Sequence, residues 1–120
     1  MAPRLEYAAF SYGDSLYIPG TWTPSEELLE HEETHADQHR AFDGGPDAWW
    51  GRYIGDQYFR VEQEAQAYAN QYVYYASRVK SREDRARYLY ALAGQLSGPM
   101  YGNVISQSAA TKLIREKARL

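Results

Sequence analysis

Cysteine is absent from the 120-residue chain. Disulfide bonds and thiolate metal sites are therefore excluded. No stretch approaches the roughly 18 apolar residues that a membrane crossing needs. The first ten residues, MAPRLEYAAF, also lack the apolar segment of a secretion signal. We therefore expect a soluble, cytoplasmic protein that does not enter a membrane.

Positive charge is not in excess either. The formal net charge is −3, whereas nucleic acids and anionic membranes bind basic surfaces, so we expect neither as a partner. Histidine is scarce: the chain has three, all between residues 31 and 39. Tyrosine is abundant, with twelve residues. Most are expected at the edge of a core, where the ring is buried and the hydroxyl remains in contact with solvent.

The length fits one domain, residues 1–120, and the patterning predicts an α+β fold that is mostly α. Residues 4–10 and 14–19 are short apolar-rich segments on either side of the turn-like SYGD, which predicts a β-hairpin. Four to five helices should follow. Their expected ranges are about 24–42, 47–54 (helical or irregular), 57–79, 82–96 and 107–119.

Local signals mark the helix boundaries. Thr23, Pro24 and Glu26 predict the start of the first helix, and GGP at 44–46 its end. Asp56 and Ser81 are expected to cap the third and fourth helices. In the last helix, Leu113 and Ile114 are expected to face inward.

The sequence HEETH, residues 31–35, fits the pattern H-E-x-x-H and lies inside the first predicted helix. His31 and His35 share one helix face, at a spacing that lets two imidazoles bind one cation. Glu32 is then placed to take a proton from a metal-bound water as a general base. The alternative is an acidic surface helix that happens to carry histidines. The same face also carries Leu28 and Phe42, which favours an inward orientation.

His39 continues this stripe, but it lies about 12 Å along the axis from His31 on a straight helix. One metal ion cannot bind His31, His35 and His39 together, so we predict a supporting or surface role for His39.

The predicted third ligand is a carboxylate on the helix at 57–79, where Glu62 and Glu64 point in nearly opposite directions. Glu62 shares a stripe with small and aromatic residues (Tyr58, Ala65, Ala69, Tyr72 and Ala76). A carboxylate on such a packed face needs compensation, which a metal ion would give. Glu64 shares its stripe with Arg60, a potential surface partner. We therefore prefer Glu62, with Glu64 as the alternative. Glu62 could also be a buried carboxylate paired with arginine or tyrosine.

HEETH followed by EQEA (residues 62–65) resembles the gluzincin zinc metallopeptidases, especially their smallest members, the minigluzincins. The resemblance covers roughly residues 4–80 and implies a minimal zincin-like architecture. The family pattern E-x-x-A-D or E-x-E-A, with its first glutamate as ligand, matches Glu62 and Ala65. It also implies an edge strand, Tyr17–Pro19 here, that pairs with an extended peptide. Residues 81–120 form a helical part outside the resemblance.

Two supporting roles follow from the resemblance. The family's second carboxylate position is Gln66 here, so Asp37, Gln38 or Gln66 is expected to orient a metal ligand. A tyrosine or histidine often stabilises the oxyanion in such peptidases, and Tyr101, in the loop SGPMYGN, is our candidate.

These observations lead to three hypotheses. The first is a zinc-dependent peptide hydrolase that acts on a peptide or protein, with Zn²⁺ on His31, His35 and Glu62 and with Glu32 and Tyr101 as catalytic residues. The second is a non-catalytic protein-interaction domain whose fold is stabilised by a bound metal ion. The third is an interaction domain without metal. Nothing in the sequence indicates the oligomeric state.

Overall fold

The described part of the chain forms a two-stranded hairpin followed by five α-helices. The structure is a computed structural model, and it describes residues 9–18, 20 and 23–120. The elements are β1 (Phe10–Tyr12), β2 (Ser15–Tyr17), α1 (Glu26–Ala41), α2 (Gly45–Gly55), α3 (Gln57–Ala76), α4 (Arg82–Leu96), the short 3-10 helix η2 (Pro99–Tyr101) and α5 (Gln107–Ala118). The predicted fold class, α+β and mostly α, is confirmed.

Side-chain caps begin α1, α3, α4 and α5, as the local sequence predicts for α3 and α4. The Asp56 carboxylate accepts hydrogen bonds from the first turn of α3, and the Ser81 hydroxyl accepts one from the amide of Asp84. The predicted start of α1 is wrong by two residues, because Ser25 is the cap in place of Thr23. Ser25 caps as well as threonine does, and its use puts two glutamates in the first turn, where the helix dipole favours negative charge.

The hairpin is antiparallel and pairs Phe10 with Tyr17, Ser11 with Leu16 and Tyr12 with Ser15. Its turn includes Gly13 at φ 60°, a conformation that glycine adopts without strain. Ser11 and Tyr12 were expected in the turn but belong to β1. The predicted strand residues 4–8 and Pro19 lie outside the described residues.

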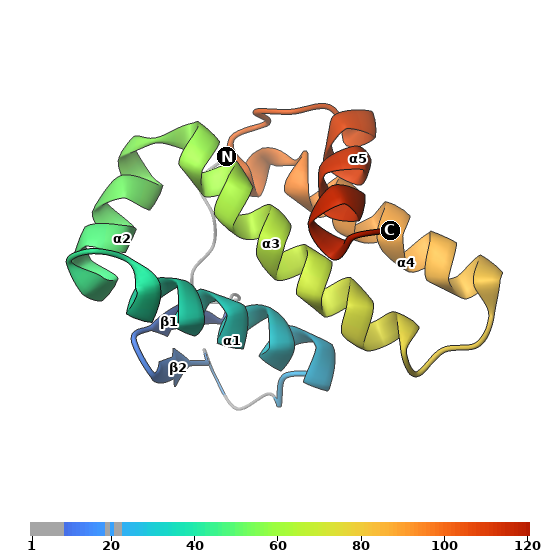
Figure 1. Cartoon of the computed structure of the whole chain (residues 1–120), viewed down its shortest axis with the longest axis horizontal. Coiled ribbons are helices and arrows are strands. Elements are labelled where there is room, and N and C mark those ends of the chain that lie inside the picture. The colour runs from blue at the N-terminus through green and yellow to red at the C-terminus, as the bar shows by residue number, and fades with distance from the viewer. Residues whose placement is uncertain (1–8, 19, 21–22) are drawn as a thin grey trace.

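Helix α3 lies between two packing partners, with α1 on one side and α4 and α5 on the other (Figure 1). Toward α4 and α5 it packs into an aliphatic and aromatic core, which we call the C-terminal core. Its buried members are Val61, Ala65, Tyr68, Ala69, Tyr72, Leu89, Leu92, Ala93, Leu96, Tyr101, Ala110 and Ile114. As predicted, Ile114 is fully buried and Leu113 packs at its edge.

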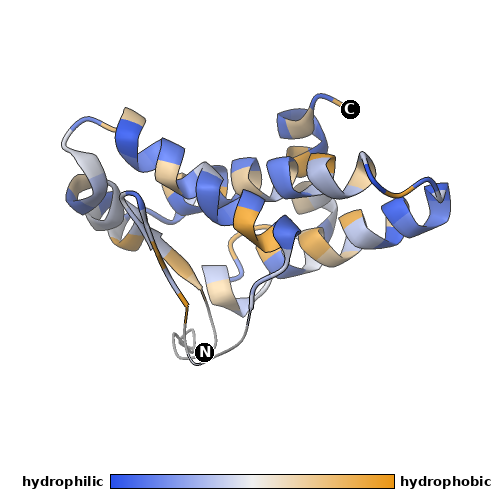
Figure 2. Ribbon diagram, turned by 90° about the horizontal axis from the view of Figure 1, so that it is seen from below, coloured by the Kyte–Doolittle hydropathy of each residue, from blue (hydrophilic) through white to orange (hydrophobic). Residues whose placement is uncertain are grey.

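Hydrophilic and hydrophobic residues alternate along the helices, as amphipathic helices require (Figure 2). Among the described residues, no helix has both the length and the apolar character for a membrane crossing.

Candidate metal centre

Helix α1 turns its histidine face inward, although its sequence is strongly acidic. Its buried residues are His31, Glu32, Thr34, His35 and His39. The two histidines of the H-E-x-x-H motif are 4% and 5% exposed, and they face α3. The prediction that this face points into the molecule is therefore confirmed.

Glu64 of α3 is the carboxylate that meets the two histidines. Its Oε1 atom lies 2.9 Å from Nε2 of His31 and 3.0 Å from Nε2 of His35. One donor atom from each of the three residues lies within 4.8 Å of the others, which is close enough to surround one metal ion. Glu64 is itself 5% exposed.

The prediction that Glu62 lies on a packed face is wrong. The Glu62 side chain is half exposed, and its carboxylate lies 2.7 Å from the ammonium of Lys117 in α5. The prediction assumed that α3 buries one stripe and exposes the other. Instead, α3 is covered on two sides, so both the stripe of Ala65 and Tyr72 and the stripe of Glu64 and Gln71 are buried.

The expected surface pair between Arg60 and Glu64 is also wrong. The Arg60 guanidinium donates to three backbone carbonyls, those of Tyr53, Ile54 and Tyr101. The family pattern E-x-x-A fits Glu64 with Ala67 as well as it fits Glu62 with Ala65. The E-x-x-A form of the motif therefore does not choose between the two glutamates, whereas the E-x-E-A form fits Glu62 alone.

Gln38 orients His35. The Gln38 side-chain amide nitrogen donates to the carbonyl of Gln63 (3.0 Å), so its oxygen faces Nδ1 of His35 at 2.8 Å. Nδ1 must then carry the proton. Of the three predicted candidates for this role, Asp37 pairs with Arg40 and Gln66 donates to Asn70, both at the surface.

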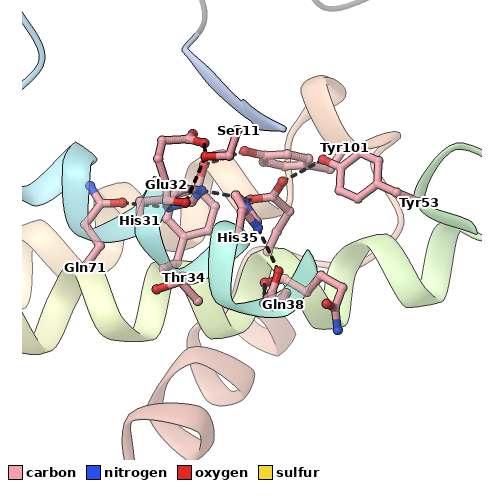
Figure 3. Close-up of polar contacts among 12 residues, drawn as sticks. Ser11, His31, Glu32, Thr34, His35, Gln38, Tyr53, Gln71 and Tyr101 are labelled. Atoms are coloured by element: carbon pink, nitrogen blue, oxygen red, sulfur yellow. Dashed lines mark hydrogen bonds and ion pairs between the residues drawn. The ribbon is translucent and has the colours of Figure 1, made fainter. Parts of the chain in front are cut away.

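Gln71 plays the same part for His31. Its oxygen lies 2.9 Å from Nδ1 of His31, and its nitrogen donates to the Tyr88 hydroxyl. Figure 3 shows the two glutamines on the outer sides of the two imidazoles. The sequence analysis missed Gln71. Its spacing of seven residues from Glu64, which puts both on one face of α3, is the signal that could have found it.

This arrangement leaves three electron-pair acceptors facing one another. With the proton on Nδ1, a neutral imidazole presents the lone pair of Nε2, and each Nε2 faces a carboxylate oxygen. Such a cluster needs a cation, either protons or a metal ion. Burial acts to lower the pKa of His35, but the charge of Glu64, the hydrogen bond to it and the charge of Glu32 together outweigh burial and raise that pKa to about 9. Burial acts to raise the pKa of Glu64, but the charge of His35 and hydrogen bonds from both histidines hold it well below its usual range.

Tyr53 of α2 supports the same carboxylate. Its hydroxyl donates to Oε2 of Glu64 at 2.6 Å, so the two oxygens of Glu64 have separate partners. Burial and the negative charge of Glu64 raise the pKa of Tyr53 above its usual range. The sequence did not single out Tyr53 among the twelve tyrosines, because only the packing of α2 against α3 brings it to Glu64.

Ser11 of β1 holds Glu32. The Ser11 hydroxyl lies 2.9 Å from both the Glu32 carboxylate and the Glu32 backbone carbonyl. Burial raises the pKa of Glu32, while the charges of His35 and His31 and the Ser11 hydrogen bond oppose that rise. The hairpin therefore approaches α1 through β1, whereas the predicted peptide-binding edge, Tyr17–Pro19, lies in β2 and beyond.

Tyr101 of η2 is buried and lines the same cavity as the two histidines. Its hydroxyl lies 2.8 Å from that of Tyr68, which in turn donates to Gln95. Burial and the charge of Glu64 raise the pKa of Tyr101 well above its usual range, so it keeps its proton at neutral pH.

His39 is fully buried, which excludes the surface position allowed for it, and it is not part of the metal-ligand cluster. Its Nδ1 atom accepts a hydrogen bond from the backbone amide of Gly13, and its ring packs on Trp49. Burial and the charge of His35 lower its pKa to about 4. His39 therefore ties the hairpin turn to α1.

A cavity of about 450 Å³ opens beside the cluster. His31, Glu32, His35 and Glu64 form part of its wall, and apolar side chains from other segments form much of the rest. The cluster is thus buried but lies next to a space of the size that small ligands occupy.

Comparisons of the chain with protein-family models, curated proteins and solved structures give no match. The resemblance to gluzincins therefore rests on the two short motifs alone.

Proposed function

We propose that this chain is a zinc-dependent peptide hydrolase in which His31, His35 and Glu64 bind Zn²⁺. The observation that carries the proposal is the convergence of three acceptor atoms within 4.8 Å. Both imidazoles donate from Nδ1 to glutamine oxygens, so their Nε2 lone pairs are directed at the shared space. Metal-ligating histidines commonly have a second hydrogen-bonded partner of this kind.

The donor set favours zinc over harder cations. Two imidazole nitrogens and one carboxylate oxygen match a catalytic zinc site, which keeps its fourth position for water or substrate. Calcium and magnesium prefer all-oxygen ligands. The adjoining cavity supplies room for a substrate on one side of the cluster.

Zinc bound at such a site lowers the pKa of a water molecule and polarises a carbonyl group. Glu32 is the proposed general base, because it lines the cavity beside His31 and is held there by Ser11. A carboxylate in this position accepts the proton of the attacking water and returns it to the leaving amine. Tyr101 is the proposed donor to the developing negative charge, after its hydroxyl turns away from Tyr68.

A non-catalytic role for the metal is the second candidate. His31, His35 and Glu64 are almost fully buried, and an ion bound by all three would connect α1 to α3, as structural metal ions do. In that case the metal stabilises the fold and Glu32 has no chemical task. The two roles predict different results when the charge of Glu32 is removed: hydrolysis is lost only if the metal is catalytic.

The test begins with elemental analysis of the untagged protein. We expect about one zinc per chain in the wild type, loss of that zinc in His35→Ala and Glu64→Ala, and its retention in Glu62→Ala, the matched control on the same helix. If the wild type contained no zinc after zinc had been added to it, the proposal would be overturned. Zinc lost in Glu62→Ala but retained in Glu64→Ala would also overturn the ligand set.

The second step is hydrolysis of a mixed peptide library by the zinc-loaded protein. We expect Glu32→Gln to bind zinc normally and to lose roughly a hundredfold or more of the rate, the contribution typical of general base catalysis. Cleavage by Glu32→Gln at the wild-type rate would favour the non-catalytic role and assign the activity to a contaminant.

A further inference from the structure

The walls of the cavity beside the cluster are built by apolar side chains from three separate segments. β1 supplies one aromatic ring, α2 supplies two rings and an aliphatic side chain, and η2 supplies a proline and a methionine. These residues are Phe10, Trp50, Tyr53, Ile54, Pro99 and Met100. Ile54 and Met100 are themselves exposed, so an apolar surface continues outward. We call this space the apolar cavity.

The polar groups in these walls already have partners. Arg60 donates from Nε to Tyr53 O (3.0 Å), from Nη2 to Ile54 O (2.9 Å) and from Nη1 to Tyr101 O (3.4 Å). The Tyr53 hydroxyl donates to Glu64, and Tyr101 shares its hydroxyl contact with Tyr68. A charged side chain that entered the cavity would lose its hydration, and the one arginine in the walls, Arg60, already donates to three carbonyl groups. An apolar side chain loses nothing of this kind.

The aromatic walls favour a ring over an aliphatic chain. Trp50 contacts Phe10 and Tyr53 edge to face, with ring centroids 6.5 and 5.0 Å apart. Such clusters extend readily to another ring, because faces and edges of aromatic groups attract one another. A volume of about 450 Å³ holds a phenyl or indole group together with part of its backbone.

We propose that the apolar cavity binds a large apolar side chain, preferably aromatic, on the substrate residue next to the scissile bond. This inference rests on the proposed hydrolase function. The position follows from the walls: Glu32, His31 and Glu64 line the same space as Trp50 and Met100. One residue of extended peptide spans only about 3.5 Å, so a side chain inside the cavity belongs to a residue beside the reacting carbonyl.

The first test observes binding without catalysis. The chain has two methionines, Met1 and Met100, so labelling of methionine methyl groups with ¹³C gives two signals, one from the cavity wall. The zinc-supplied Glu32→Gln protein is titrated with three blocked tripeptides that carry Phe, Ser or Asp between two alanines. We expect the Phe peptide to shift the Met100 signal with a Kd at least tenfold lower than the Kd of the Ser or Asp peptide.

Two matched variants locate the effect. Ile54→Asp puts a charge on the cavity wall and is expected to weaken the Phe peptide about tenfold. Val73→Asp makes a similar change at an exposed apolar residue of α3 outside this cavity, and is expected to leave binding unchanged. Equal binding of the Phe and Ser peptides would overturn the inference. Preferential binding of the Asp peptide would overturn it too, and would assign the cavity to a carboxylate held by Arg60.

A cleavage map separates this inference from the proposed function. In a digested peptide library, we expect cuts beside Phe, Tyr, Trp, Met and Leu. Efficient cleavage without that bias would overturn the inference and leave the hydrolase intact. Selective binding of the Phe peptide by a protein that cleaves nothing would overturn the hydrolase and support the apolar cavity as a binding site.

Discussion

The two sides of α3 are packed by different chemistry. Toward α4 and α5, the C-terminal core is made of valine, leucine, isoleucine, alanine and tyrosine. Toward α1, the buried residues include histidines, glutamates, Thr34 and Gln71, each with specific hydrogen-bond partners. The first side stabilises the fold by removing apolar surface from water, while the second places costly polar groups where each needs its partner.

This difference indicates that one side of α3 mainly stabilises the fold, while the other side arranges polar groups. Polar groups buried in a fixed arrangement cost stability unless every partner is present, so such clusters are expected where chemistry requires them. A core on the far side of the same helix can offset that cost. Substitutions on the two sides should therefore affect different measurements.

The largest effect is expected in the C-terminal core. Ile114→Ala removes a fully buried side chain from α5 and should lower the free energy of unfolding by about 2–5 kcal/mol. The cluster does not contact this residue, so zinc content per folded chain should not change. Chemical denaturation and elemental analysis test the two halves of this prediction. Ile114→Val, with an expected loss of about 1 kcal/mol, serves if the alanine variant does not fold. Loss of zinc from folded protein would contradict the separation of the two sides.

His39, on the side of α3 that faces α1, should make the stability of the folded state sensitive to acid. Its folded pKa of about 4 lies below the usual 6.5, so the folded state binds fewer protons than the unfolded state between these values. The contribution of His39 to stability should therefore fall as the pH falls from about 6.5 toward 4, and should be nearly constant above that range. Between pH 7.5 and 4.5, we expect metal-free wild type to lose about 2 kcal/mol more than His39→Leu. Urea denaturation at both pH values measures this difference, and equal losses would contradict it.

Gln38→Leu should lower the affinity of the proposed site for metal and leave the C-terminal core unchanged. The substitution removes the oxygen that accepts the Nδ1 proton of His35. Loss of such a supporting partner typically lowers metal affinity about 10- to 100-fold. Gln66→Leu is the matched control, because Gln66 only donates to Asn70 at the surface of α3. Competition with a chromophoric chelator measures both affinities. Equal affinities for the two variants would remove Gln38 from the site.

The sequence predicts the fold well because its signals are local. Asp56 and Ser81 cap the helices they precede. Gly44 lies between α1 and α2, and Gly45 and Pro46 begin α2. The spacing of His31 and His35 is local in the same sense. Any helix at these residues puts the two imidazoles on one face.

The positions of Glu62 and Glu64 were mispredicted because they depend on tertiary packing. Glu62 and Glu64 lie on one helix, and only the direction from which α1 approaches α3 decides between them. A rule of one buried stripe fails for a helix covered on two sides. Ser11 and Tyr53 were missed for a related reason: each reaches the site from an element whose position no short motif specifies.

Ser11 allows the finest test of the polar side, because its hydroxyl holds the proposed base without touching a metal ligand. Ser11→Ala should cost about 1 kcal/mol of stability, the usual value of one hydrogen bond, and should lower kcat several-fold while zinc content and KM stay unchanged. Ser11→Thr, which keeps the hydroxyl, should restore part of the rate. His39→Leu is the control for hairpin attachment, because it removes the Gly13 contact but leaves Glu32 and Ser11 in place. If both variants lowered kcat equally, Ser11 would act only by attaching the hairpin. If Ser11→Ala alone lowered it, the hydroxyl would position the carboxylate, and the crystal structure of that variant should contain Glu32 in more than one rotamer.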